Sequence, residues 1–237
     1  MRSDHSVSWR AGEFVDASLN NNTVVAHGNN TDIVDYGRVG GKSLRLNNSV
    51  ATGSYVTIQN DTDLSLDGSF TIEAWVLFAG DVNTDAPKYH DIIASEHYAL
   101  GETGVCSQDQ PSGDVFMFRI EVSEMVVVLE SCDVTLGAER ELDGNIAYGM
   151  WHHFAWVRSA DANILFLNGR VRHIFSYDRT LNDMEGLKVG KGSLSGVTFL
   201  SGYIDELMIT RHARYTKEFE PISACGFAEQ LANGGVC

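Results

Sequence analysis

Tyrosine, histidine and acidic side chains come together around two long polar stretches, residues 79–91 and 101–114. Tyr89, His90, Asp91 and Tyr98 lie at the end of the first stretch or just beyond it. Sugar rings stack on exposed aromatic faces, and carboxylates accept hydrogen bonds from hydroxyl groups. Long polar loops are also frequent places for binding sites. We predict that these four residues bind a ligand, with a solvated loop of packed tyrosines as the alternative.

A single carboxylate interrupts an apolar segment near the end of the chain. Asp205 lies in GYIDELMIT, residues 202–210, and strand alternation places it on the same face as Tyr203. A buried carboxylate is costly unless it is paired, hydrogen-bonded or bound to a metal ion. The position predicts either a metal site or a carboxylate that caps nearby backbone amides.

The residue patterns of common hydrolases are missing. Glycoside hydrolysis needs two carboxylates about 5–10 Å apart, and Glu73 is alone in its segment FTIEAWV. Glu139, Glu141 and Asp143 come closest to such a group, but we interpret this stretch as a loop. The sequence also contains no G-x-S-x-G nucleophile elbow and no G-x-x-x-x-G-K-[ST] phosphate loop. We predict that the chain is not an enzyme.

Two adjacent histidines, His152 and His153, follow Trp151 in a segment with strand character. Successive side chains of a strand point to opposite faces, so this pair is poorly placed to hold one metal ion. We predict packing and hydrogen-bonding roles for both histidines.

Composition and charge exclude several kinds of partner. The 237 residues include 17 Lys and Arg against 32 Asp and Glu, giving a net charge of −15. Such an acidic chain is a poor partner for a nucleic-acid backbone or an anionic membrane. No apolar run approaches the roughly 18 residues of a membrane-spanning helix, and residues 1–10 lack the apolar core of a secretory signal. We expect no nucleic-acid partner, no membrane insertion and no signal peptide in this chain.

Four cysteines allow three disulfide pairings. Their order along the chain favours Cys106 with Cys132 and Cys225 with Cys237, and free buried thiols are the alternative. The absence of a C-x-x-C motif argues against a zinc ribbon.

Short alternating segments separated by turn residues dominate the chain. They predict about ten to twelve strands, at residues 43–46, 55–58, 70–78, 91–100, 115–122, 125–130, 151–158, 164–167, 170–175, 187–190 and 202–210. Asn168-Gly169 is the residue pair that a two-residue hairpin turn favours. Helical periodicity is confined to residues 223–232. Strands without intervening helices indicate an all-β, two-sheet antiparallel β-sandwich, or jelly roll, and we predict one domain over residues 1–237.

Several of these segments, taken in order, resemble a known family. They are KSLRL at 42–46, FTIEAWV at 70–76, WHHFAWVR at 151–158, ILFLNGR at 164–170 and GYIDELMIT at 202–210. The series resembles the concanavalin A-like lectin/glucanase superfamily, in its laminin G-like and pentraxin-like branch, over residues 40–221. The resemblance implies a jelly-roll binding module of secreted, cell-surface or virion proteins, with residues 222–237 as a short C-terminal segment. The ending ARYTKEFEP at 213–221 also resembles laminin G-like modules of phage structural and tail proteins.

The same resemblance implies a structural Ca²⁺ ion. In this superfamily an acidic residue of the last strand often holds Ca²⁺ together with groups from the N-terminal segment, and Asp205 matches that position. The resemblance suggests Asp16 as its companion, with Asp35 as a competitor. Laminarinase-type members carry their catalytic carboxylates as Glu-x-Asp-x-x-Glu, a spacing that this sequence lacks.

Three functional hypotheses follow. We favour a non-enzymatic module that recognises a glycan or surface protein, within a larger extracellular or virion assembly. The second hypothesis is a structural virion domain of a phage tail or capsid, with homo-oligomer or other virion components as its partners. The third is an atypical glycoside hydrolase.

Overall fold

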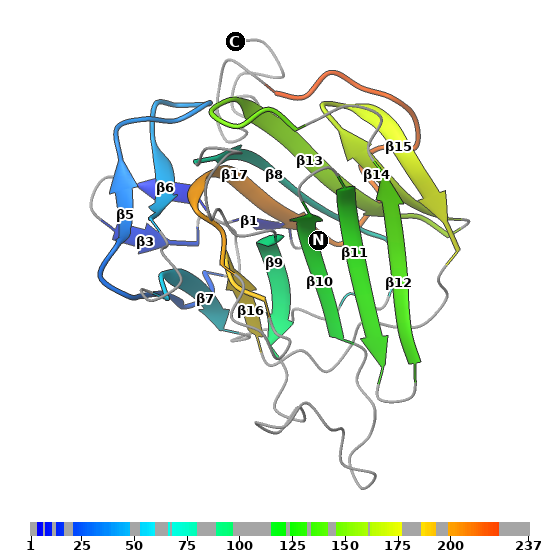
Figure 1. The fold of residues 1–237 in the computed structure, drawn as a ribbon, viewed down its shortest axis with the longest axis horizontal. Coiled ribbons are helices and arrows are strands. Elements are labelled where there is room, and N and C mark those ends of the chain that lie inside the picture. The colour runs from blue at the N-terminus through cyan, green and yellow to red at the C-terminus, as the bar shows by residue number, and fades with distance from the viewer. Residues whose placement is uncertain are drawn as a thin grey trace, which may run out of the picture.

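Seventeen β-strands and no helix make up the described part of the chain. The computed structural model describes residues 4–6, 8–10, 13–16, 21–47, 53–59, 66, 68–79, 89–96, 115–121, 124–131, 134–141, 146–160, 162–176, 186–192 and 199–222. Two large antiparallel sheets lie face to face (Figure 1). The predicted all-β, two-sheet antiparallel sandwich is confirmed.

The first sheet has eight strands and includes the last of the described strands. Its members are β1 (Asp4–Ser6), β5 (Thr31–Val34), β6 (Ser43–Leu46), β8 (Phe70–Phe78), β13 (Trp151–Arg158), β14 (Asn163–Leu167), β15 (Arg170–Phe175) and β17 (Gly202–Thr210). They run in the order β15-β14-β13-β8-β17-β6-β5, and β1 also pairs with β17. Between β14 and β15, Asn168 and Gly169 have φ angles of 51° and 73°, as the predicted hairpin turn requires.

The second sheet has seven strands. They are β4 (Val24–His27), β7 (Tyr55–Gln59), β9 (Tyr89–Glu96), β10 (Val115–Glu121), β11 (Glu124–Ser131), β12 (Val134–Glu141) and β16 (Gly186–Val189). Their order is β12-β11-β10-β9-β16-β7-β4, and a separate ribbon pairs β2 (Ser8–Arg10) with β3 (Glu13–Val15). The predicted hairpin between β10 and β11 is confirmed, with Glu121 opposite Glu124. The loop expected around Glu139 and Glu141 is wrong, because β12 pairs with β11 through both residues.

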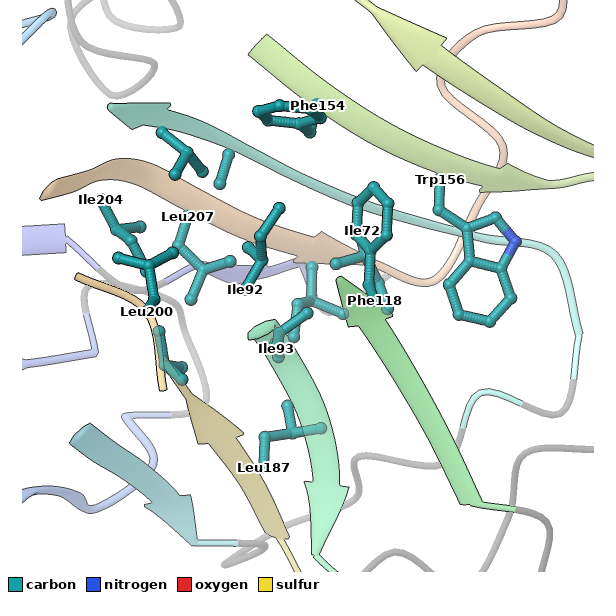
Figure 2. Close-up of a cluster of buried hydrophobic side chains, with 14 of the residues drawn as sticks. Ile72, Ile92, Ile93, Phe118, Phe154, Trp156, Leu187, Leu200, Ile204 and Leu207 are labelled. Atoms are coloured by element: carbon teal, nitrogen blue, oxygen red, sulfur yellow. The ribbon is translucent and has the colours of Figure 1, made fainter. Parts of the chain in front are cut away.

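The hydrophobic core lies between the two sheets. Figure 2 shows Ile72, Phe154 and Ile204 of the eight-stranded sheet directed toward Ile93 and Phe118 of the other sheet. All five side chains are almost completely buried. Burial of this apolar surface is the main force that holds the sheets together.

The central strand β8 is buried along its whole length, on both faces. Strand alternation places Phe70, Ile72, Ala74, Val76 and Phe78 on one face, and this face lines the core between the sheets. Residues 211–222, which we call the C-terminal strap, cover the opposite face from Thr71 to Trp75. Thr71 Oγ1 donates to the carbonyl oxygen of His212 over 2.9 Å, and Trp75 Nε1 donates to that of Ile222 over 2.8 Å. The strap therefore gives the first sheet a second buried layer.

Some predictions fall outside the described residues. The predicted helical stretch 223–232 and the cysteines Cys106, Cys132, Cys225 and Cys237 all lie there. Their structure and pairing stay predictions.

Candidate functional site

Three aromatic side chains gather at one place on the eight-stranded sheet. The ring centroid of Tyr36 lies 5.0 Å from that of Tyr203 and 6.1 Å from that of Trp151, and Trp151 and Tyr203 are 6.3 Å apart. Tyr36 is 49% exposed, while Trp151 and Tyr203 are half-buried. We call these three residues the aromatic patch. Its rings are tilted to one another, so they offer both faces and edges to a ligand.

Strand pairing extends this patch into a row across five neighbouring strands. The row consists of Trp151 (β13), Leu77 (β8), Tyr203 (β17), Arg45 (β6) and Asp32 (β5), each paired with the next. Residues paired directly across a sheet lie on the same face. Their chain neighbours Val76 and Ile204 point into the core, so the row lies on the outer face.

The turn that carries Tyr36 is held by a buried carboxylate. Asp205 Oδ2 accepts hydrogen bonds from the backbone N–H groups of Arg38 at 2.7 Å and of Val39 at 2.8 Å. Ser43 Oγ donates to the carbonyl oxygen of Tyr36, which ties the start of the turn to β6. These bonds place Tyr36 over the sheet before any ligand arrives, which lowers the entropic cost of binding.

Residues 35–42 also approach one another closely across this turn. A side-chain carbon at Gly37 would lie 2.4–2.7 Å from backbone atoms of Lys42, so only glycine fits there. Lys42 Nζ and Asp35 form an ion pair at the base of the turn. The geometry of the turn therefore depends on its own sequence as well as on Asp205.

Two ion pairs border the aromatic patch. Arg45 Nη2 lies 2.6 Å from Asp32 Oδ2, with side chains 43% and 44% exposed, and Lys42 pairs with Asp35. The hydrogen bond that Arg45 donates to Asp32 raises the pKa of Arg45 above its ordinary value. Charged groups with both donors and acceptors thus lie within reach of a molecule resting on the rings.

Asp205 itself is 2% exposed and lies at a β-bulge. The register of β17 against β8 shifts between Asp205 and Met208, and Glu206 in the bulge has a φ of 49°. Burial raises the pKa of Asp205 to about 7, and the amides of Val39 and Arg38 partly oppose that shift.

The two residues predicted to hold Ca²⁺ have hydrogen-bond donors as neighbours. Asp205 Oδ2 faces two backbone amides, and Asp16 Oδ2 accepts from the backbone N and from Nδ2 of Asn22, each at 2.9 Å. Within the described residues, no group of three or more His, Cys, Asp or Glu side chains is placed to hold a metal ion. Amide donors stabilise a carboxylate, whereas a Ca²⁺ site needs six to eight oxygen ligands. These surroundings fit the amide-capping alternative, and calcium binding here stays a prediction.

The predicted ligand residues are not assembled on a loop. Tyr89, His90 and Asp91 belong to strand β9, while Tyr98 lies outside the described residues. His90 is 1% exposed beside the ring of Phe78, and desolvation lowers the pKa of His90 to about 4. Asp91 is fully buried and pairs through Oδ1 with Arg119 Nε at 2.8 Å. His90 and Asp91 are therefore buried in a strand and not exposed on a loop, and ligand binding by the four residues stays a prediction.

Glu73 is enclosed beneath the C-terminal strap. Its carboxylate lies 2.6 Å from Arg214 Nη1 and 3.2 Å from His153 Nε2, and Tyr215 donates its hydroxyl hydrogen to Glu73 over 3.0 Å. Burial, with Glu73 nearby, raises the pKa of Tyr215 above its ordinary value. This closed cluster ties β8 and β13 to the strap and gives Glu73 a structural role.

The adjacent histidines diverge to the two faces of β13, as predicted. His153 contacts Glu73 on the outer side. His152 Nε2 lies 3.1 Å from the carbonyl oxygen of Ala147, and its ring lies beside Phe154 in the core. Neither histidine belongs to the aromatic patch.

Sequence reasoning missed the aromatic patch. The sequence suggests a core position for Trp151, because this residue begins a largely apolar strand. It gives Tyr203 no special role, because this residue is simply one member of an alternating strand. The signal that the sequence does contain is an aromatic residue at or near the start of two strands, Trp151 in β13 and Tyr203 in β17, together with Tyr36 in a turn. Only the pairing of β13, β8 and β17 brings the three together.

The chain belongs to the family described as the Concanavalin A-like lectin/glucanases superfamily, whose laminin G-type profile matches residues 50–218. The predicted resemblance is thereby confirmed. No curated protein sequence matches the chain.

Solved structures share this fold at low sequence identity. The binding domain of Paraclostridial Mosquitocidal Protein 1 is similar with a TM-score of 0.64 and 18% identity, over 90% of this chain and 50% of that one. Domain 4 of AbnA, an extracellular GH43 arabinanase from Geobacillus stearothermophilus solved with arabinotriose, has a TM-score of 0.62 and 15% identity, over 90% and 95%. The enzymatically active domain of bacteriophage CBA120 tailspike protein 2 has a TM-score of 0.53 and 13% identity, over 79% and 28%. The chain thus spans about half of the toxin binding domain it matches, and these likenesses establish the fold alone.

Proposed function

We propose that this chain is a non-catalytic carbohydrate-binding module and that the aromatic patch is its glycan site. The observation that carries the proposal is the cluster of Tyr36, Trp151 and Tyr203 on the outer face, with ring centroids 5.0–6.3 Å apart. Aromatic faces bind the apolar C–H surfaces of sugars, and flanking polar groups bind the hydroxyls.

The described carboxylates support a binding role over hydrolysis. Glu73 is buried among Arg214, His153 and Tyr215, and Asp205 is held by two amides. Asp32 and Asp35, at the patch, are each paired with a cation. A glycosidase needs one carboxyl group that can donate a proton and a second that faces the sugar, and these assignments leave neither role filled at the patch.

The relatives are consistent with a module that works within a larger protein. Domain 4 of AbnA was solved with arabinotriose, and the mosquitocidal protein structure is of a binding domain. We propose an extracellular or virion-surface setting, where such a module would bring its parent protein to a glycan. Among the described residues, no helix has the length and apolar character needed to cross a membrane.

The test is a glycan array probed with the wild-type chain, Tyr36→Ala and Ile174→Ala. Ile174 is 57% exposed on β15, at the opposite edge of the same sheet, and serves as the matched control. Loss of one stacking ring should weaken binding about tenfold in Tyr36→Ala, with Ile174→Ala unchanged. Equal binding by Tyr36→Ala and wild type would place the glycan elsewhere, and no glycan binding would reject the proposal.

A further inference from the structure

We propose that the ligand of the aromatic patch is an uncharged glycan, recognised through hydroxyl groups by the ion pairs Arg45–Asp32 and Lys42–Asp35. This inference rests on the proposed function and concerns the chemical class of the ligand. It begins from the charged side chains of β5, β6 and the turn between them, which border the three rings.

Each of these two cations already has a carboxylate partner. Arg45 Nη2 lies 2.6 Å from Asp32, and Lys42 Nζ is paired with Asp35. A sulfate, sialate or uronate group would have to displace an aspartate from its cation, or would bind beside that aspartate and be repelled by it. An acidic glycan site needs a cation whose charge is available, and these pairs do not provide one.

A third cation on the same face is also engaged. The guanidinium carbon of Arg38 lies 4.8 Å from the ring centroid of Trp75, and the backbone N–H of Arg38 donates to Asp205. A cation–π contact with an indole keeps a guanidinium close to the protein surface. Arg38 thus covers Trp75, and burial, helped by the charge of Glu206 in the bulge of β17, raises the pKa of the neighbouring Asp205.

The two ion pairs also have a hydrogen-bonding pattern that suits neutral sugars. A sugar hydroxyl both donates and accepts a hydrogen bond, so adjacent hydroxyls fit a site that places acceptors beside donors. Asp32 offers carboxylate oxygens and Arg45 offers guanidinium N–H groups in one place, and both side chains are more than 40% exposed. Tyr203 is the next residue of the row, so a sugar stacked on its ring would reach this pair.

The experiment compares neutral oligosaccharides with sialylated, uronate-containing and sulfated ones at about 50 mM and about 500 mM NaCl. We expect the wild-type chain to bind neutral glycans, with less than about a threefold change in Kd between the two salt concentrations. Asp32→Asn leaves the shape of the row intact but removes the partner charge of Arg45. This variant should gain binding to acidic glycans and become sensitive to salt. Circular dichroism confirms that it is folded.

Each outcome separates the two proposals. Wild-type binding to acidic glycans that weakens about tenfold or more at high salt, and is also weakened in Tyr36→Ala, would overturn the neutral ligand while keeping the glycan site. Failure of Asp32→Asn to gain any acidic-glycan binding or salt sensitivity would overturn the role assigned to the Arg45–Asp32 pair. Absence of binding to either class would reject the proposed function, and with it this inference.

Discussion

Asp205 binds the backbone of Val39, a residue 166 positions earlier in the chain, with 2.8 Å between Oδ2 and the amide nitrogen. Val39 is 2% exposed, so this bond is shielded from solvent. The contact joins the last strand of the sandwich to the turn that carries Tyr36. One buried carboxylate thereby links the stability of the fold to the shape of the aromatic patch.

Replacing Asp205 should therefore cost both stability and binding. Asp205→Ala leaves two backbone N–H groups without their acceptor, each costing about 1–3 kcal/mol, and the free energy of unfolding should fall accordingly. Asp205→Asn keeps one acceptor oxygen and should lose less. Urea unfolding and glycan titration measure the two effects, with the exposed Glu220→Ala as control. Wild-type stability in Asp205→Ala would show that other contacts hold the turn.

The amide neighbours of Asp205 also bear on the calcium prediction. If Asp205 acts as an amide cap, thermal unfolding should be the same in EDTA and in added Ca²⁺, with Mg²⁺ as control. If Ca²⁺ binds only the folded protein, a free Ca²⁺ concentration about one hundred times Kd would instead stabilise the fold by about 2.7 kcal/mol. The Tm would then rise by roughly 5–11 °C. A shift specific to Ca²⁺ and absent in Asp205→Asn would establish the metal site that the resemblance implied.

His90 should make the fold sensitive to acid. Burial lowers the pKa of His90 to about 4, whereas an unfolded histidine titrates near 6.5. Between these values the unfolded chain binds the proton and the folded chain does not, so stability is present above about pH 6.5 and falls toward pH 4. The loss from this one residue amounts to about 3 kcal/mol at most.

His90→Leu should reduce this acid sensitivity and remain stable at neutral pH, because its neighbours Phe78 and Tyr148 are aromatic. Urea unfolding at a series of pH values between about 4 and 7 measures the slope. Part of the slope should remain, because burial also lowers the pKa of His152. An unchanged slope in His90→Leu would mean that other groups cause the acid sensitivity.

Glu73 should hold the C-terminal strap in place. Glu73→Ala removes the carboxylate that Arg214 and His153 share in a buried site, which costs about 3–5 kcal/mol. Glu73→Gln should lose less, because its amide oxygen can still accept the bond from Tyr215. Limited trypsin digestion should cut after Arg214 and Lys217 faster in Glu73→Ala. Cleavage at the wild-type rate would show that Trp75 and Thr71 secure the strap without Glu73.

Two-residue periodicity was enough to predict most of the fold. The alternation in Phe70–Phe78 marked β8 as a strand, and Asn168-Gly169 marked the turn between β14 and β15, because both signals act over a few neighbouring residues. The burial of the outer face of β8 could not be predicted. It depends on a strap more than 130 residues later, which no local pattern reveals.

The candidate site was harder to predict for the same reason. Tyr89 and His90 attracted attention because they are neighbours in the sequence, yet His90 is buried in β9. Tyr36, Trp151 and Tyr203 are distant in the sequence and meet only through strand register. Asp205 was correctly singled out as a costly carboxylate, but its partners, the amides of residues 38 and 39, could not be read from the chain.

The row across β13, β8, β17, β6 and β5 has a consequence for how the aromatic patch forms during folding. Its members come from residues 32, 45, 77, 151 and 203, so almost the whole chain must be in place before the patch exists. Contacts so far apart in sequence form late and cooperatively. Neither a fragment nor a partly folded chain would display the patch. If the patch binds glycans, the fraction of protein retained on a glycan column would therefore measure the fraction of natively folded molecules. Such a column would serve as a conformational assay during refolding.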